Sequence, residues 1–545
     1  MAVLLRPAAI AGGRQVWPVA EDHQLHYDAE AASQRLVEAV ARGDAREAGD
    51  LLASGRADVN YAGVVWLKAR RVAEAALRDD AAAELRAAHD EIRADVSPLF
   101  LAAGNGDASL VLALLAKGAD VNGKAFRGYP TTAAAREGRA EVAALLVRAG
   151  ASQPACEEAV VEAALQGQAA LAAIFMGSDL VRPRVAVHAL VSAAARGFAD
   201  VVDTLIKCGA DPNATARVLL RSLKPSLHAN VDCTALFAAI VSRQIAVVRQ
   251  LLQAGVRRDT KVRLGAWSWD TATGEELRVG AGLAEPYDAV WCAVEYYEST
   301  GSILRMLLQN GCLSGAGHLG LTLLHHAVLC GSSGAVQTLL ASGIEPEAPV
   351  KTSRSSRSRS VHMAARLGQP EILKMLIGMG CDVNARAEGG GRRRRCHTRR
   401  APQARGLLEG PRVGRSGRRA VELGRSSDRN VFSSMMFVAR CGDASAMEVL
   451  LAQPDVDVDE QDMDGCSPIM VAAKEDNVDA FRGLVFAAAN VKQSNKRGET
   501  AIGLAQQSKK RDLFELVCSS SRWRRACLGT STRSTAPPGA VAPRR

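Results

Sequence analysis

A short helical unit that recurs along the chain constrains the fold more than any other feature of the sequence. Its clearest copy spans residues 360–384, where an Ala-rich apolar segment breaks at Gly368 and a second segment repeats apolar residues at helical spacing before Gly380. The pattern predicts two helices joined by a tight turn and followed by an Asp-Val-Asn exit. Each helix is apolar on one face, so a single unit cannot bury that face without neighbours.

Near copies of this unit occupy residues 97–122 and 192–213, and weaker copies recur along the rest of the chain. The unit resembles the ankyrin repeat, which has a period of about 33 residues and ends, in its fullest form, with Gly-Ala-Asp-Val-Asn. The resemblance implies an all-α ankyrin-repeat solenoid of about twelve repeats, in which stacked neighbours bury the apolar faces.

The chain has 545 residues, more than one globular core usually holds, and a stack of repeats escapes that limit because each repeat contacts only its neighbours. The predicted divisions are an N-terminal segment (1–32), a repeat (33–60), an insertion (61–94), repeats (95–213), an insertion (214–230), a repeat (231–258), a β-hairpin insertion (259–286), repeats (287–387), a basic low-complexity segment (388–430), repeats (431–521) and a basic tail (522–545). The Ala, Glu, Arg and Leu content of the first insertion predicts an inserted helical hairpin, with a disordered charged loop as the alternative.

Alternating side chains in the third insertion predict its β-hairpin. Val262 and Leu264 lie on one side of an extended segment and Trp267 and Trp269 on the other, before a Thr-Ala-Thr-Gly turn. Tryptophan is enriched at interaction hot spots, so Trp267 and Trp269 are the candidate protein-contact residues. The alternative is that the hairpin folds back and both indoles cover the neighbouring repeat.

The same insertion, with Trp-Ser-Trp-Asp at residues 267–270, is similar to one found in a group of long plant ankyrin-repeat proteins. Residues 152–159 and 224–228 are similar to that group as well, and the likeness covers about 16–387 and 431–517. The resemblance implies an interaction role in plant cells and carries over no defined activity.

The net charge of +10 is concentrated in two segments that do not resemble repeats. Residues 388–425 contribute +9, with twelve arginines and three glutamates, and residues 522–545 contribute +6, with six arginines and no acidic residue. The rest of the chain therefore carries −5, so basicity is not a property of the repeat array.

The basic segment at 388–430 has two interpretations. We favour translation of this segment and the tail out of frame, because a GC-rich reading frame misread by one base yields Arg, Gly, Ala and Pro. The other interpretation is a true basic linker between two repeat blocks. The break glycines on either side, Gly368 and Gly442, are 74 residues apart, which leaves room for one further repeat.

A true linker would offer a basic or nuclear-import site. Its candidate residues are Arg392, Arg393, Arg394, Arg395, Arg399 and Arg400. Aromatic residues, which would stack on bases, are absent from 388–425, so a nucleic-acid partner is disfavoured.

Three histidines stand at predicted repeat corners, namely His325, His326 and His362. An ankyrin corner normally places a histidine there that ties adjacent turns by hydrogen bonds. No acidic residue or thiol accompanies these histidines at ligand spacing, so a structural role is favoured over metal binding or catalysis.

Aspartates recur once per repeat, at Asp58, Asp120, Asp211 and Asp382. Their regular spacing indicates turn residues that hydrogen-bond the local backbone, rather than paired carboxylates for acid–base chemistry. No nucleotide-binding glycine motif, nucleophile elbow or His-Glu-x-x-His helix occurs, so the sequence predicts no enzyme, no cofactor and no metal site.

Twelve cysteines occur without a Cys-x-x-Cys pair and predict free thiols buried in a reducing compartment, with Cys208, Cys292, Cys330 and Cys518 on apolar positions of predicted helices. No run of about 18 apolar residues predicts a membrane span. A secretory signal is not evident, whereas residues 1–20, with two arginines and no acidic residue, leave an organelle transit peptide as an alternative.

These observations predict a monomeric intracellular protein, in the cytoplasm, the nucleus or both. The predicted function is a non-enzymatic scaffold or adaptor that binds unidentified protein partners on the concave surface built from its turns and first helices. One alternative is a nucleic-acid-associated or nuclear factor that uses the Arg-rich segment. Another is a substrate adaptor that acts in trans with a ubiquitin ligase.

Overall fold

The structure is a computed structural model, and it describes residues 21–70, 89–125, 128–221, 227–262, 268–270, 276–277, 286, 288–311, 321–349, 358–389 and 430–507. Two compact units are present. Unit 1 consists of residues 1–298 and 309–312, and unit 2 of residues 299–308 and 313–545. Both are built from pairs of helices, which confirms the predicted all-α solenoid.

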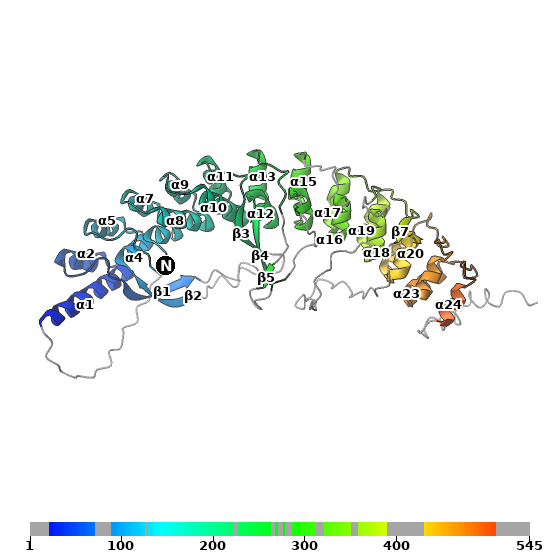
Figure 1. Ribbon diagram of the computed structural model, residues 1–545, viewed down its shortest axis with the longest axis horizontal. Helices are drawn as coiled ribbons and strands as arrows, with labels where there is room; N and C mark the ends of the chain where they lie inside the picture. Colours follow the sequence, from blue (N-terminus) through cyan, green and yellow to red (C-terminus); the bar gives the residue numbers. More distant parts are fainter. Residues whose placement is uncertain are drawn as a thin grey trace, which may run out of the picture. The chain divides into compact units, whose positions relative to one another are not determined.

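Unit 1 contains α1 (Glu21–Arg42), α2 (Ala45–Ser54), α4 (Pro98–Asn105), α5 (Ala108–Ala116), α6 (Pro130–Arg136), α7 (Ala140–Arg148), α8 (Gln153–Gln166), α9 (Ala169–Met176), α10 (Pro183–Arg196), α11 (Ala199–Lys207), α12 (Ala235–Val241), α13 (Ile245–Gln253) and α14 (Ala289–Glu295). The first helix of each pair packs on the first helix of the next pair, and the second helices pack on one another in the same way. Within unit 1 the pairs therefore form two parallel rows (Figure 1).

Unit 2 contains α15 (Ser302–Gln309), α16 (Leu323–Cys330), α17 (Ser333–Ala341), α18 (Ser360–Leu367), α19 (Pro370–Gly378), α20 (Ser434–Cys441), α21 (Ala444–Leu451), α22 (Pro468–Lys474), α23 (Val478–Phe486) and α24 (Ala501–Gln507). The pair α18–α19 is the unit from which the repeat was recognised, and it breaks at Gly368 as predicted. Gly368 adopts a left-handed conformation with φ of 63°, which glycine reaches without a steric penalty.

Small buried side chains let neighbouring first helices approach closely. Ala102 and Ala103 of α4 are fully buried, as are Ala134 and Ala135 of α6. The second helices contribute larger residues, such as Leu114 of α5, to the layer between the rows. The core therefore runs along each unit as a continuous layer rather than as one globular centre.

The first insertion contains an antiparallel β-hairpin, so the predicted helical hairpin is wrong where the structure describes this segment. Strand β1 (Gly63–Arg70) pairs with β2 (His89–Val96), with Val65 opposite Ala94. Val65, Ala94 and Val96 are buried, and β1 contacts α1. The Val-Val-Trp run in β1 favours an extended strand, and burial of one face outweighs the helical composition of the rest of the insertion.

The second and third insertions together form one four-stranded antiparallel sheet. Its order is β3 (Ala216–Arg221), β4 (Leu227–Cys233), β5 (Ser268–Asp270) and β6 (Glu276–Leu277). Pairing of β5 with β6 confirms the β-hairpin predicted for the third insertion, and Ser268 lies opposite Leu277. Pairing of β4 with β5 joins two segments that the sequence analysis treated separately.

Two short paired strands, which we call the neck, flank the basic low-complexity segment. Residues 390–429 of that segment lie outside the described residues. Strand β7 (Ala387–Gly389) pairs antiparallel with β8 (Asn430–Phe432), so the chain leaves and re-enters at one place. Helix α18 packs directly on α20, and α19 packs on α21. The spacing between Gly368 and Gly442 suggested room for one further repeat. Because the two helix pairs pack directly on each other, no further repeat lies between them.

Candidate protein-binding surface

The recurring aspartates shape the turns, as the sequence predicts. In each turn the aspartate carboxylate accepts a hydrogen bond from the backbone N–H two residues on, at 2.9 Å. The aspartates are Asp58, Asp120, Asp211 and Asp382. These bonds fix the turn backbone locally and leave no carboxylate pair for acid–base chemistry at these positions.

The asparagine at the end of the repeat joins one turn to the next, a role that the sequence analysis missed. Asn122 donates from Nδ2 to the carbonyl oxygen of Gly150 at 3.2 Å, and its Oδ1 accepts from the N–H of Ser152 at 2.6 Å. Asn60 makes the same two bonds to Gly118 and Asp120, at 3.2 and 2.7 Å. The amide side chain thereby satisfies backbone groups of the following turn and sets the spacing between turns.

A glutamate makes this connection where the turn has no asparagine. Glu157 of α8 accepts hydrogen bonds from Nε and Nη2 of Arg182, at 2.6 and 2.7 Å, and from the N–H of Arg182 at 3.1 Å. The side chain of Glu157 is only 9% exposed. The Arg182 hydrogen bonds lower the pKa of Glu157 to about 2, against the opposing effect of burial.

Glu347 of unit 2 makes a comparable connection. Its Oε1 accepts from the N–H of Asp382 at 3.0 Å, and its Oε2 forms an ion pair with Arg359. Arg359 immediately precedes α18, just as Arg182 immediately precedes α10. Both substitutes therefore combine a glutamate with the arginine that begins the next repeat.

Across the neck, Asn384 restores the usual connection. Its Nδ2 donates to the carbonyl of Asp455 at 2.7 Å, and its Oδ1 accepts from the N–H of Asp457 at 2.9 Å. Arg386 adds an ion pair to the largely buried Glu460 at 2.5 Å. The turns on either side of residues 390–429 are thus joined as consecutive turns.

His362 links its own helix to the following turn. Its Nδ1 accepts from the N–H of Arg359 at 3.0 Å, so Nε2 carries the proton that it donates to the carbonyl of Ala385 at 2.7 Å. The ring is 1% exposed. Burial lowers the pKa of His362 to about 4, against the effect of the Ala385 carbonyl.

The other two histidines are fully buried in α16. Nδ1 of His325 lies 2.7 Å from Oγ1 of Thr322, at the start of the helix. Burial lowers the pKa of His325 to about 4, and the backbone of Ser358 acts in the opposite direction. Nε2 of His326 lies 3.8 Å from the sulfur of Cys330, four residues further along α16, so the expectation that no thiol accompanies these histidines is wrong for His326.

The first hairpin is fastened to the row of first helices by Gln34 of α1. Its side-chain amide donates to the carbonyl of Val64 at 3.0 Å and accepts from the Val64 N–H at 3.2 Å, as a neighbouring strand would. A Cβ atom on Gly63 would lie 2.9 Å from Cβ of Val37 in α1, so this close approach requires glycine. Trp66, opposite Arg93 in β2, remains 40% exposed.

Polar side chains connect the first helices of unit 1, with α8 at the centre. Glu158 forms an ion pair with Lys124 at 3.1 Å, and Glu162 forms one with Arg136 at 3.1 Å. Arg196 of α10 donates to the carbonyl of Leu165 at 2.7 Å. We call these residues the first-helix face: Lys124, Arg136, Glu158, Glu162 and Arg196. Hairpin β1–β2 and the β3–β6 sheet project on the side of the first helices (Figure 1).

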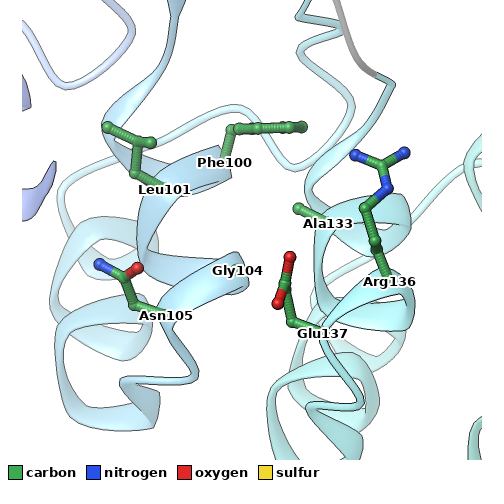
Figure 2. A pocket seen from close by; sticks show the side chains of 7 residues that line it. All are labelled: Phe100, Leu101, Gly104, Asn105, Ala133, Arg136 and Glu137. Carbon is green, nitrogen blue, oxygen red and sulfur yellow. The ribbon is translucent and has the colours of Figure 1, made fainter. Parts of the chain in front are cut away.

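A small hollow lies between α4 and α6 (Figure 2). It is lined by Phe100, Leu101, Gly104, Asn105, Ala133, Arg136 and Glu137. The ring of Phe100 extends from α4 toward α6, and the carboxylate of Glu137 stands beside Gly104. The free space is comparable to one water molecule, far less than a small-molecule ligand needs.

Most of the other candidate contact residues predicted from the sequence lie outside the residues that the structure describes. Trp267 and the arginines from Arg392 to Arg400 are not among the described residues. Trp269 lies in β5, where its backbone pairs with Glu276 of β6 and His228 of β4.

The described cysteines are free thiols. Cys292 is buried as predicted and Cys330 is half-buried, whereas Cys208 is exposed because it follows the last turn of α11. Cys518 lies outside the described residues.

Among the residues that the structure describes, no helix is long and apolar enough to cross a bilayer. In the same part of the chain, no group of three His, Cys, Asp or Glu side chains is arranged to hold a metal ion.

Two comparisons with known families match the chain. A family described as ankyrin repeats (3 copies) matches residues 290–387 and 435–523. A family described as ankyrin repeat matches residues 95–125 and 187–217. Between these matches, α6–α7 and α8–α9 have the same helix–turn–helix form, so the structure extends the array beyond the matched segments.

Proposed function

We propose that this chain, which matches ankyrin-repeat families over four of its segments, is a non-enzymatic scaffold or adaptor that binds a protein partner on the first-helix face. Ankyrin repeats mediate protein–protein interaction, and the proposal adds the place of contact in this chain. The partner would lie along α6, α8 and α10, between hairpin β1–β2 and the β3–β6 sheet. Trp66 on one side and the sheet on the other would flank it.

The connection between successive turns is the observation that carries this proposal. Asn60, Asn122 and the Glu157–Arg182 pair hold consecutive turns of unit 1 in a fixed relation before any partner arrives. A surface that is already ordered loses little conformational entropy on binding. The ion pairs of the first-helix face add fixed positions of charge, which favour one complementary partner over others.

Trp66 is the residue of this region best suited to carry binding energy. Its side chain is 40% exposed on a strand that Gln34 holds against α1. A rigidly held, partly exposed tryptophan supplies a large contact area at a small cost in side-chain entropy. Trp267 and Trp269 of the third insertion remain proposed contact residues on the same argument.

The experiment is affinity capture with the tagged full chain, followed by mass spectrometry and reconstitution with each purified candidate. The test variants are Trp66→Ala and Glu162→Lys, which change the proposed face. The matched controls are Leu112→Ala, on an exposed position of α5, and Asp203→Lys, on an exposed position of α11. Loss of one purified partner with both test variants and with neither control supports the proposal.

Two alternatives are separated by the same experiment. Capture repeated with nuclease, and with residues 390–429 removed, tests a nucleic-acid-associated or nuclear role for Arg392–Arg395, Arg399 and Arg400. Recovery that collapses under either condition would transfer the function to the basic segment. Recovery of a ubiquitin ligase together with a protein whose ubiquitination depends on this chain would favour a substrate adaptor acting in trans.

A further inference from the structure

A thiol and an amine are held in contact in the turn that precedes α22. The Nζ atom of Lys474, at the end of that helix, lies 2.9 Å from the sulfur of Cys466. Nδ2 of Asn495, from the following turn, lies 3.7 Å from the same sulfur. Cys466 is 2% exposed, whereas Lys474 is an exposed residue.

The backbone around Cys466 is fixed by Asp462. The Oδ1 atom of Asp462 accepts from the N–H groups of Cys466 and Asp464, at 2.7 and 2.9 Å. The N–H of Asp462 donates to the carbonyl of Cys466 at 3.0 Å, and the N–H of Lys496 donates to the carbonyl of Asp464 at 2.9 Å. The sulfur is therefore held in place, while the long lysine side chain can adjust around it.

We propose that Cys466 and Lys474 form a covalent sulfenamide link when a hydroperoxide oxidises the thiol. The distance between the two atoms leaves only a small movement of the lysine side chain before a bond can form. Sulfenic acids are known to condense with nitrogen nucleophiles held next to them. The reacting partner is thus already in place before the oxidant arrives.

The reaction has two steps. The sulfur attacks one oxygen of hydrogen peroxide, the O–O bond breaks, and Cys466 becomes a sulfenic acid while one water leaves. The ammonium of Lys474 releases one proton to water, and its nitrogen then attacks the sulfur. The S–O bond breaks, and the departing hydroxide takes a second proton from the nitrogen and leaves as a second water. One thiol, one amine and one peroxide give one sulfenamide and two waters.

Cys208 lacks this arrangement. Cys208 is exposed and follows Lys207, but the Nζ atom of Lys207 lies 2.6 Å from Oδ2 of Asp203. The sulfur of Cys466, by contrast, accepts a hydrogen bond from the amine of Lys474.

The link would tie the turn before α22 to the end of the same helix. It would also change the surroundings of Asn495, whose amide reaches the sulfur from the next repeat. An oxidant would in this way alter the connection between two successive repeats, and a thiol reductant would reverse it because sulfenamides are reduced by thiols.

The test is treatment of the purified full chain with hydrogen peroxide, with and without dimedone, followed by digestion without reductant and mass spectrometry. The expected product is a peptide in which Cys466 and Lys474 are joined, with two hydrogens lost and trypsin cleavage after Lys474 blocked. Dithiothreitol should restore both the mass and the cleavage. Cys208, which is exposed, serves as the internal reference for ordinary thiol oxidation.

Two variants make the result decisive. Lys474→Arg keeps the positive charge but removes the amine, so Cys466 should be trapped by dimedone and no link should form. Cys466→Ser should abolish both products, and hydrogen exchange of α22 should show that each variant is folded. Oxidation of wild-type Cys466 that stops at dimedone-reactive or higher acids, or no oxidation of Cys466 until α22 has unfolded, would overturn the proposal.

Discussion

The guanidinium of Arg182 donates two hydrogen bonds to the carboxylate of Glu157, across the boundary between two repeats. At the corresponding boundary one repeat earlier, the link is the single amide side chain of Asn122. An ion pair and an amide therefore perform the same mechanical task at successive boundaries. The repeat formed by α8 and α9 is therefore held in the array, although the turn before α8 lacks the asparagine.

Replacement of Glu157 by Gln should destabilise unit 1 by about 1–2 kcal/mol, because Arg182 loses the charged partner of its two hydrogen bonds. The folded-state pKa of Glu157, about 2, lies below its ordinary value of 4.5. The carboxylate therefore contributes stability above pH 4.5, and that contribution is lost as the pH falls toward 2. Urea unfolding of both proteins as a function of pH measures the difference.

The matched control is Asp203→Asn, which removes an exposed ion pair with Lys207 within α11. It should leave the unfolding midpoint unchanged. Equal effects of the two substitutions would show that the Glu157–Arg182 pair contributes no more than a surface ion pair.

Replacement of Asn122 by Ala should loosen one boundary without unfolding unit 1. The Gly150 carbonyl and the Ser152 N–H would lose their partner, at a cost of about 1–2 kcal/mol. Hydrogen exchange read by mass spectrometry should show faster exchange in residues 119–125 and 150–155, and unchanged exchange in α1 and α12. Uniform acceleration over the whole unit would contradict a local role.

Acid should weaken unit 2 through its buried histidines. His325 and His362 have folded-state pKa values of about 4, below the ordinary 6.5, because burial disfavours the charged ring. The unfolded chain takes up these protons first, so the free energy of unfolding falls as the pH drops from 6.5 toward 4. The loss is at most about 3 kcal/mol for each histidine.

His362→Gln should reduce this pH dependence, because glutamine has no group that titrates in that range. At neutral pH the variant should be less stable by about 1 kcal/mol, since a bond to Ala385 is weakened. His188→Gln, on a half-exposed position of unit 1, should leave the acid response of unit 2 as it is. Hydrogen exchange of α16–α20 across this pH range provides the measurement.

Deletion of residues 390–429, with Gly389 joined to Asn430 through an Asn-Gly turn, should preserve unit 2. Strands β7 and β8 already bring these ends together, and Asn384 joins the flanking turns without help from the deleted segment. Exchange rates in α18–α21 should stay the same. Faster exchange there, with loss of the α18–α20 contact, would show that the segment supports the fold.

The features that repeat were readable from the sequence, and those that depend on one tertiary neighbour were not. The spacing of apolar residues and the break glycines predicted the helix pairs, and the once-per-repeat aspartates predicted the turns. By contrast, Glu157 and Arg182 are 25 residues apart and of common types, so nothing local marks them as partners. The pairing of β1 with β2 likewise depends on burial against α1, which outweighed a composition typical of helix.

The candidate protein-binding surface could likewise be predicted only in part. Its location on first helices and turns was predicted from the repeat. The exposed Trp66 and the ion pairs around α8 became visible only with the structure, because they depend on which side chains of different repeats meet. Trp267 and the arginines of the basic segment stay predictions.

The neck formed by β7 and β8 allows the array to accept inserted segments of different lengths at one point. Gly389 and Asn430 lie opposite each other, and α18 already packs on α20. The length of the segment between residues 389 and 430 therefore does not affect the position of α20. Related transcripts that differ only in this stretch would encode the same stack of repeats. A fluorescent protein inserted between residues 389 and 430 would be attached to unit 2 without disturbing the packing of its repeats.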